Sequence, residues 1–283
     1  MPLSPSSSAQ AARKAVAGRL RELRSRAGLT ITELADRCGW HHSKTSRIEN
    51  ARTSPAAADI LAWCRACGAA DEAPDLITQS VNAASMYAEW RHQVRGGLTA
   101  LQEDGNRLFR NTSTFRVYST TLIPGLLQTH GYAAALLSGI ADFRGVPDDS
   151  EAAAAARTGR ARILHEPGRR FLLLIEEGVL RHQIGDTNVM AAQLGHLLSA
   201  GYLPSVSLGV IPSRTPARPF RPVETFHLYD RTLASVELVT AAVNITQPSE
   251  INLYLTAFER LRGIAVYGAQ ARALIADAIK ALG

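Results

Sequence analysis

Cysteine is scarce in this sequence of 283 residues, with only three, at Cys38, Cys64 and Cys67. Three clustered cysteines are too few for a disulfide framework, which fits a reducing compartment. No uninterrupted apolar run reaches the roughly 18–20 residues that a membrane span needs. Residues 1–10 are rich in Ser, Pro and Ala and lack the basic and apolar stretches of a signal peptide. We therefore expect a cytoplasmic protein with no membrane partner, beginning with a disordered lead-in over residues 1–10.

Acidic residues are also scarce in the first quarter of the chain. Residues 1–70 hold 11 basic and 5 acidic residues, whereas the other 213 residues hold 20 of each. The net charge of +6 therefore comes entirely from the first quarter. This asymmetry predicts a basic module with a polyanionic partner, joined to a neutral module. Hydrophobic residues make up 46% of the chain, enough for real cores and against wholesale disorder.

The basic module, residues 11–70, has the periodicity of short helices. Val16, Leu20 and Leu23 form one apolar stripe, and Gly28 closes that helix as a C-cap. Thr30 caps a second helix, with a Glu three positions on as in a capping box. The predicted helices cover residues 11–28, 31–38, 42–50 and 56–67.

The spacing between residues 31 and 50 is typical of a helix-turn-helix. Ala35 is small where two helices must cross closely, and Gly39 stands where the turn favours a left-handed backbone. The positions expected to face inward are Leu34, Cys38, Trp40, Thr45 and Ile48. The second helix of such a motif enters the DNA major groove.

The segments Gly28-Leu29-Thr30, Glu33-Leu34-Ala35, Gly39-Trp40 and Ser43 to Glu49 resemble the XRE, or Cro-like, helix-turn-helix family in its actinobacterial form. The likeness covers about residues 13–68. It implies an all-α, five-helix, lambda-repressor-like domain that binds double-stranded DNA as a homodimer. The alternative is a helical bundle with no DNA role.

The resemblance also implies which side chains meet DNA. The implied base contacts are His42, Ser43, Ser46 and Arg47. The implied backbone contacts are Thr32, Lys44, Asn50 and Arg52. Arg47 is the strongest candidate for a guanine, because a guanidinium can pair with O6 and N7 together; the alternative is a phosphate or intramodule contact. We expect Glu49 to form a salt bridge with an arginine of the first helix, since a carboxylate repels phosphates.

The pair Cys64-x-x-Cys67, with Cys38 as a third thiol, invites a metal site. No second pair follows at zinc-ribbon spacing, and both cysteines lie on a predicted helix. We therefore predict core thiols, no metal and no cofactor.

The rest of the chain predicts a helical connector over residues 71–97 and an α+β domain over residues 98–283. The predicted strands are 115–119, 171–175, 206–211, 225–229 and 235–239. The predicted helices are 123–137, 150–164, 189–200, 250–262 and 268–282.

The run Leu122 to Thr129, followed by Tyr132-Ala133, resembles a domain of unknown function that accompanies XRE modules in actinobacterial regulators. The likeness implies a regulatory domain that often works with a small companion protein. Four residues of this run are candidates for contact with a ligand or partner: Pro124, Gly125, Gln128 and Thr129. The alternative is a packed helix start with no ligand.

The neutral module offers little that indicates catalysis. Glu176, Glu177 and Glu237 lie at predicted strand ends, where paired carboxylates could share acid/base work. No nucleophile stands beside a base, and no known catalytic motif is present. We expect solvated strand-end carboxylates and no enzyme.

The sequence thus predicts a sequence-specific transcriptional regulator whose C-terminal domain senses a ligand or a small partner protein. The alternative is the DNA-binding member of a toxin–antitoxin-like pair, which represses its own promoter together with a small companion protein.

Overall fold

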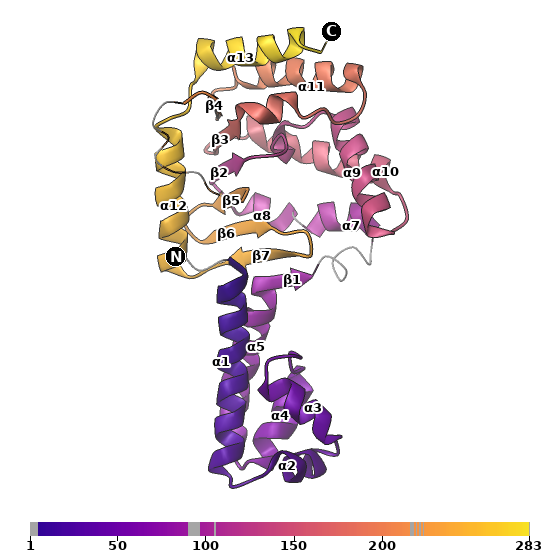
Figure 1. Ribbon diagram of the computed structural model, residues 1–283, viewed down its shortest axis with the longest axis vertical. Coiled ribbons are helices and arrows are strands. Elements are labelled where there is room, and N and C mark those ends of the chain that lie inside the picture. The colour runs from indigo at the N-terminus through magenta and orange to yellow at the C-terminus, as the bar shows by residue number, and fades with distance from the viewer. Residues whose placement is uncertain are drawn as a thin grey trace. The chain divides into compact units, whose positions relative to one another are not determined.

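The computed structural model describes residues 5–89, 97–104, 106–215, 218, 220, 222 and 224–282. The chain divides into two compact units. The N-terminal unit is Met1–Ala88 with Ala241–Asn244, and the C-terminal unit is Glu89–Thr240 with Ile245–Gly283. Helices build the first unit, and the second combines a mixed sheet with helices (Figure 1). The predicted fold class, an all-α domain followed by an α+β domain, is confirmed.

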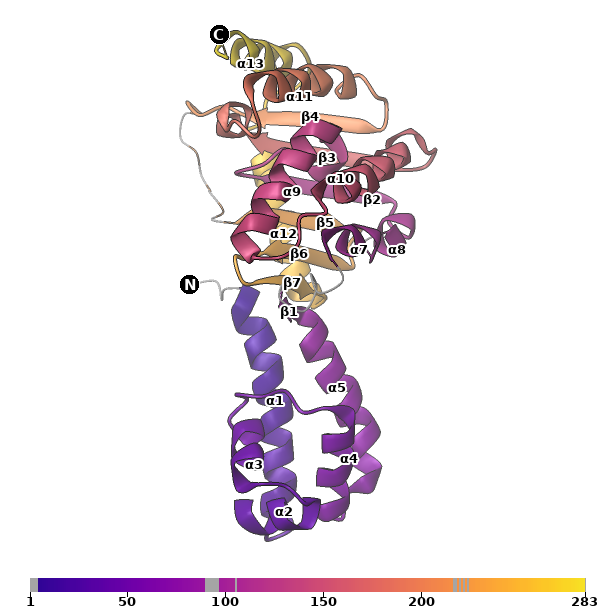
Figure 2. The same ribbon diagram turned by 90° about the vertical axis from the view of Figure 1, so that its right-hand side faces the viewer.

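Five α-helices form the N-terminal unit. Two long helices, α1 and α5, run side by side; α3 and α4 pack against them, and α2 packs against α3 and α4 (Figure 2). The bounds are α1 Pro5–Arg26, α2 Ile31–Cys38, α3 His42–Glu49, α4 Ala57–Ala66 and α5 Ala73–Met86, with the 3₁₀ turn η1 Ala70–Glu72 before α5.

The first helix begins earlier than the sequence pattern predicts. It starts at Pro5, so helix replaces most of the disordered lead-in expected over residues 1–10. Proline suits the first position of a helix, because its fixed φ is already helical and its missing N–H needs no partner there. The apolar periodicity that indicates a helix begins only at Val16, so the sequence does not predict the earlier turns.

The segment expected to be a connector is largely the fifth helix of the N-terminal unit. Ala73 and Leu76 of α5 are buried in the same apolar cluster as Leu20 and Trp63. The Trp63 indole Nε1 donates a hydrogen bond of 3.0 Å to the Leu20 carbonyl, which fixes α4 against α1. The core of this unit therefore extends beyond residue 70.

A mixed sheet forms the centre of the C-terminal unit, with strand order β6-β5-β2-β3-β4. Strand β3 is parallel to β2 and β4, whereas β5 is antiparallel to β2 and β6. The bounds are β2 Thr114–Ser119, β3 Arg170–Glu176, β4 Val206–Ile211, β5 Phe226–Tyr229 and β6 Leu233–Glu237. All five overlap predicted strands. Two further strands, β1 Tyr87–Glu89 and β7 Ala241–Ile245, span the residues at which the chain passes from one unit to the other.

Helices cover both faces of this sheet, with α12 on one face and α7 to α10 on the other (Figures 1 and 2). The α-helices are α7 Gly97–Asp104, α8 Asn106–Arg110, α9 His130–Arg144, α10 Ser150–Gly159, α11 Thr187–Ala200, α12 Pro248–Arg262 and α13 Gly268–Lys280. The 3₁₀ helices are η3 Gly125–Leu127, η4 Arg160–His165 and η5 Glu177–Arg181.

The apolar core of the C-terminal unit follows the alternation of its strands. Phe115 of β2 and Phe171 of β3 are opposite each other in register and stack with ring centroids 4.8 Å apart. Because β3 lies between two parallel neighbours and both its faces are covered, nearly every residue along it is apolar. Gly209 of β4 is required on the other face, where a Cβ would come within 2.7 Å of Leu174 and 2.8 Å of Tyr267.

Candidate nucleic-acid interface

The turn between α2 and α3 has the geometry that the sequence predicts. Gly39 is left-handed, with φ 67°, and follows the last residue of α2. Ala35 is 1% exposed, and its carbonyl accepts a 2.8 Å hydrogen bond from the backbone N–H of Trp40. The small residue and the left-handed glycine together let the chain turn sharply and bring α3 against α2.

A capping box starts α2. The Thr30 hydroxyl accepts from the Glu33 N–H, and the Glu33 carboxylate accepts from the Thr30 N–H at 2.8 Å. These backbone and side-chain hydrogen bonds from Thr30 lower the pKa of Glu33 below its usual value. The predicted cap is confirmed, and it fixes the start of the helix on which Thr32 is exposed.

The inner side of α3 is held by a buried ion pair. The Glu49 carboxylate, 3% exposed, contacts Arg24 Nε of α1 at 2.5 Å and Nη2 at 3.2 Å. Arg24 also donates from Nη1 to the Leu29 carbonyl, which joins the end of α1 to the turn before α2. Glu49 therefore forms the salt bridge expected from the sequence, and Thr45 and Ile48 are buried beside it.

The outer side of α3 carries the four residues predicted to contact bases. His42 and Arg47 are exposed, and Ser43 and Ser46 are half-buried. The Ser43 hydroxyl lies 2.9 Å from Nδ1 of His41, the residue that caps the helix. The guanidinium group of Arg47 forms no hydrogen bond or ion pair with any residue that the structure describes. One helix face thus presents polar side chains outward while the opposite face is buried.

The four residues predicted to contact the DNA backbone differ in their freedom. The side chain of Arg52 is exposed and forms no ion pair or hydrogen bond with a described residue. Its backbone N–H donates to the Arg47 carbonyl at 2.9 Å. Thr32 is exposed on α2. Lys44 instead forms a 2.7 Å ion pair with Asp59. Asn50 is occupied as well, since its amide donates to the Ser46 carbonyl at 2.8 Å.

Two of the contacts that hold Lys44 were not foreseen. Asp59 of α4 accepts the Ala56 N–H at 3.1 Å as well as Lys44, so one carboxylate caps α4 and draws the lysine inward. The Lys44 ammonium also lies 4.2 Å from the centroid of the Trp40 ring. An aspartate in the first turn of the predicted helix indicates the cap, but it does not indicate the ion pair with Lys44.

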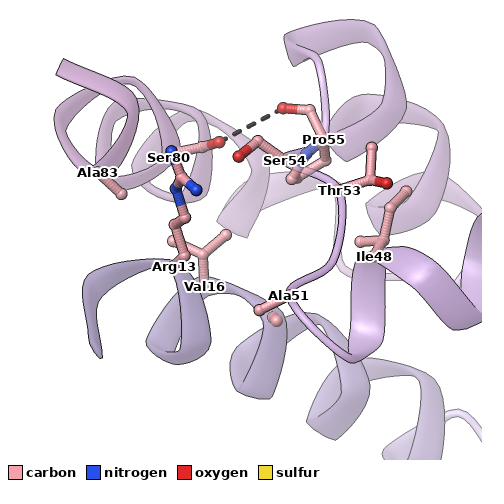
Figure 3. A pocket seen from close by; sticks show the side chains of 10 residues that line it. Arg13, Val16, Ile48, Ala51, Thr53, Ser54, Pro55, Ser80 and Ala83 are labelled. Carbon is pink, nitrogen blue, oxygen red and sulfur yellow. Dashed lines mark hydrogen bonds between the residues drawn. The ribbon is translucent and has the colours of Figure 1, made fainter. Parts of the chain in front are cut away.

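A small cavity lies behind α3, within the N-terminal unit (Figure 3). It measures about 10 Å³, which is room for about one water molecule. Ser80 of α5 lines it and donates to the Pro55 carbonyl at 3.4 Å. The cavity is too small for an organic ligand.

The three cysteines are free thiols in the core of the N-terminal unit. Burial raises the pKa of all three, most of all that of Cys67, to about 11. Protonated, buried thiols are poor metal ligands and poor nucleophiles. Among the described residues, no group of three or more potential ligands is placed to hold a metal ion.

The candidate ligand contacts of the C-terminal unit lie inside it. A 3₁₀ turn, η3, replaces the predicted start of the helix, and α9 begins only at His130. Gln128 is 4% exposed, and its amide donates to the Ile123 carbonyl at 2.8 Å. Pro124 is buried, Gly125 is half-buried, and Thr129 caps α9 while its N–H donates to Gln193 at 2.7 Å. The internal amide contacts of this turn draw Gln128 inward, as in the alternative of a packed start to the helix.

The three carboxylates considered for catalysis do not share one site. Glu176 accepts a 2.6 Å hydrogen bond from the Tyr118 hydroxyl and pairs with Arg218. Glu177 accepts the Ser213 N–H at 2.8 Å. Glu237 is exposed at the end of β6. Each of the first two has structural partners, and the third is solvated.

Comparison with known proteins agrees with this two-part architecture. Residues 15–76 match a helix-turn-helix domain, and residues 109–277, more than half of the chain, match a domain of unknown function, DUF5753. No curated protein and no solved structure matches the chain. None of the described helices is long and apolar enough to cross a membrane. The helix-turn-helix domain indicates a DNA-binding regulator, and by its C-terminal domain the chain belongs to the DUF5753 family.

Proposed function

We propose that this chain is a sequence-specific transcriptional regulator of the XRE type, from an actinobacterium, that acts in the cytoplasm. The observation that carries the proposal is the two-sided environment of α3. Glu49 anchors its inner side to Arg24, while the guanidinium group of Arg47 is exposed with no partner among the described residues. A rigidly held helix with a free guanidinium is suited to pairing with a guanine edge.

The remaining contacts divide by chemistry. His42, Ser43 and Ser46 stand on the same face as Arg47 and are proposed to read bases with it. Arg52 and Thr32 are proposed to hold the DNA backbone. Lys44 and Asn50 would first have to leave their intrachain partners, so we assign them a smaller share of the backbone contacts.

Two copies of the chain are proposed to bind a pseudo-palindromic site, with half-sites about 34 Å apart, as two-fold helix-turn-helix dimers do. The C-terminal unit is proposed to supply the regulatory input rather than catalysis. That input is a small ligand or, in a toxin–antitoxin-like arrangement, a small companion protein.

The test begins with selection of binding sites from random duplex DNA by the full chain, followed by affinity measurements on the selected site. We expect Arg47→Ala to cost about 1–3 kcal/mol and to relax preference at one base pair, and Arg52→Ala to weaken all sequences evenly. Arg65→Ala, an exposed arginine on α4, is the matched control and leaves affinity within about twofold. Recovery of no preferred sequence would refute the proposal, and an even loss on every sequence for Arg47→Ala would refute the base-reading role.

A further inference from the structure

Two arginines converge inside the C-terminal unit near the end of α10. Arg157 of α10 and Arg160 of η4 are both half-buried. Arg157 Nε donates to Gln102 Oε1 at 3.1 Å, and Arg160 Nη2 donates to that same oxygen at 2.5 Å. Arg157 Nη1 also donates to Gln128 Oε1 at 3.0 Å. Two guanidinium groups are therefore held side by side by amide oxygens from other elements.

Neutral amides orient these guanidinium groups but do not compensate their charge. Among the described residues, no carboxylate lies within 4.0 Å of Arg157 or Arg160. By contrast, three other arginines with little exposure each pair with a glutamate. Those pairs are Arg24 with Glu49, Arg169 with Glu166, and Arg218 with Glu176.

The cost of this arrangement appears in the pKa of both groups. Burial, and after it the positive charge of Arg157, lowers the pKa of Arg160 to about 10. Burial likewise lowers the pKa of Arg157. Both remain protonated near neutral pH, so the unit holds two adjacent cations that a bound anion would stabilise.

A further hydrogen-bonding group lies near these arginines, because Phe109 contacts both the Arg160 guanidinium and Tyr229, whose ring centroid is 5.9 Å from that of Phe109. Tyr229 of β5 is 9% exposed, and its hydroxyl forms no hydrogen bond with any described residue. Burial raises the pKa of Tyr229, so the phenol stays protonated and can donate. His227 lies on the same face of β5, with its ring centroid 6.3 Å from that of Tyr229. Burial, and also the charge of Arg157, lowers the pKa of His227, although Glu237 opposes this.

Three further observations describe the surroundings of these side chains. The ring of Phe109 lies 4.9 Å from the Arg160 guanidinium and fixes its plane. Arg157, Arg160 and His227 are all partly exposed. Glu237 is the acidic group whose charge acts on Arg157 and His227, but it is exposed and forms no ion pair with either arginine.

We propose that Arg157, Arg160, Tyr229 and His227 bind the phosphate group of a small molecule. Two guanidinium groups match the charge of a phosphate dianion, and their planar N–H pairs match its oxygens. The phenol and the imidazole supply further hydrogen bonds from the sheet. If the chain is the regulator proposed above, a phosphate-bearing molecule is the ligand that it senses. This regulatory role rests on the proposed function, whereas phosphate binding itself does not.

The experiment uses the full chain and isothermal titration calorimetry, without DNA. The probes are inorganic phosphate, adenosine monophosphate and acetate, each at constant ionic strength set with chloride. We expect saturable binding of phosphate or of adenosine monophosphate, and weaker binding of acetate. Which of the two phosphates binds more tightly distinguishes a site for the free ion from a site for a phosphate ester. Tighter binding of acetate than of both phosphates would overturn the assignment.

Matched variants separate a ligand site from a structural cluster. Arg157→Gln and Arg160→Gln should each weaken phosphate binding about 10- to 100-fold. Glu237→Gln should strengthen it, because a nearby negative charge is removed. Arg162→Gln, at an exposed arginine two residues from Arg160, should bind phosphate as the wild type does.

The stability of the ligand-free protein gives a second readout. Because the two charges repel and neither forms an ion pair with a described carboxylate, Arg157→Gln and Arg160→Gln should leave the melting temperature without phosphate unchanged or higher. A structural role predicts a clear fall instead, and that fall together with unchanged phosphate binding would overturn the proposal. Recovery of no preferred DNA sequence bears only on the proposed function, whereas the absence of phosphate binding bears only on this proposal, so the two failures are distinguishable.

Discussion

Replacing Glu49 with glutamine should destabilise the N-terminal unit markedly, because it removes one charge from a buried pair. Glu49 is 3% exposed and Arg24 is 15% exposed, so the arginine would keep its charge with little solvent. Breaking a buried pair in this way costs about 3–5 kcal/mol. The glutamine oxygen can still accept one bond from Arg24, and the Leu29 carbonyl accepts another. We therefore expect a loss of about 2–3 kcal/mol in the free energy of unfolding.

A double-mutant cycle tests the source of this loss. Arg24→Met and Glu49→Met should each cost a similar amount, whereas the variant that combines these two changes should cost less than their sum, by about 1.5–3 kcal/mol. The assay is urea unfolding followed by tryptophan fluorescence, because Trp63 is buried in the core of this unit and Trp40 packs against that core.

Arg19→Met is the matched control for the cycle. Arg19 pairs with Glu22 and Glu72 but is 36% exposed, so its loss should cost less than about 1 kcal/mol. Strictly additive losses for Arg24 and Glu49, or a cost for Glu49→Gln no larger than that of the control, would refute the argument from burial.

Three further changes test local features. Because the pKa of Glu33 is lower in the folded protein, the ionised carboxylate stabilises the fold at pH values above its unfolded pKa, and this stabilisation is lost as the pH falls through the folded pKa. Glu33→Gln should therefore flatten the dependence of melting temperature on pH between about pH 5 and 3. Ala51 has φ 52°, a left-handed conformation that costs about 1–2 kcal/mol without glycine, so Ala51→Gly should raise the urea midpoint. An unchanged or lower midpoint would contradict this. Gly209→Ala should lower the stability of the C-terminal unit by about 1–3 kcal/mol in circular-dichroism melts, because the new Cβ meets Leu174 and Tyr267, and a neutral effect would show that these side chains yield freely.

The parts of the structure that the sequence predicts well are those built from neighbouring residues. Ala35, Gly39 and Ile48 lie within fourteen positions, so their spacing alone defines two helices and the turn that joins them. The capping box of Thr30 and Glu33 is likewise readable, because both partners belong to one helical turn. In the C-terminal unit, the strand 206–211 was predicted with its observed bounds, since an apolar run between turns is a local signal.

The parts that escaped depend on contacts between distant residues. Gln128 is drawn inward by partners that include Arg157, a contact that no spacing reveals. The ion pair of Lys44 with Asp59 forms only after α4 has folded back. Strand β7 was missed because Ala241 to Ile245 includes two alanines and an asparagine, which are weak strand formers. The sequence gives no signal for the role of Arg160, because its contact with Gln102 joins residues 58 positions apart.

The long fifth helix has a practical consequence for dividing this chain into fragments. The match to the helix-turn-helix domain ends at residue 76, in the first third of α5, yet Ala83 is buried near Val16 and Ala17 of α1 around the small cavity. A fragment cut at the family boundary would strip the last turns of α5 from α1 and leave an apolar strip facing water, which favours aggregation. The shortest recombinant fragment worth expressing for DNA-binding work therefore ends no earlier than Met86.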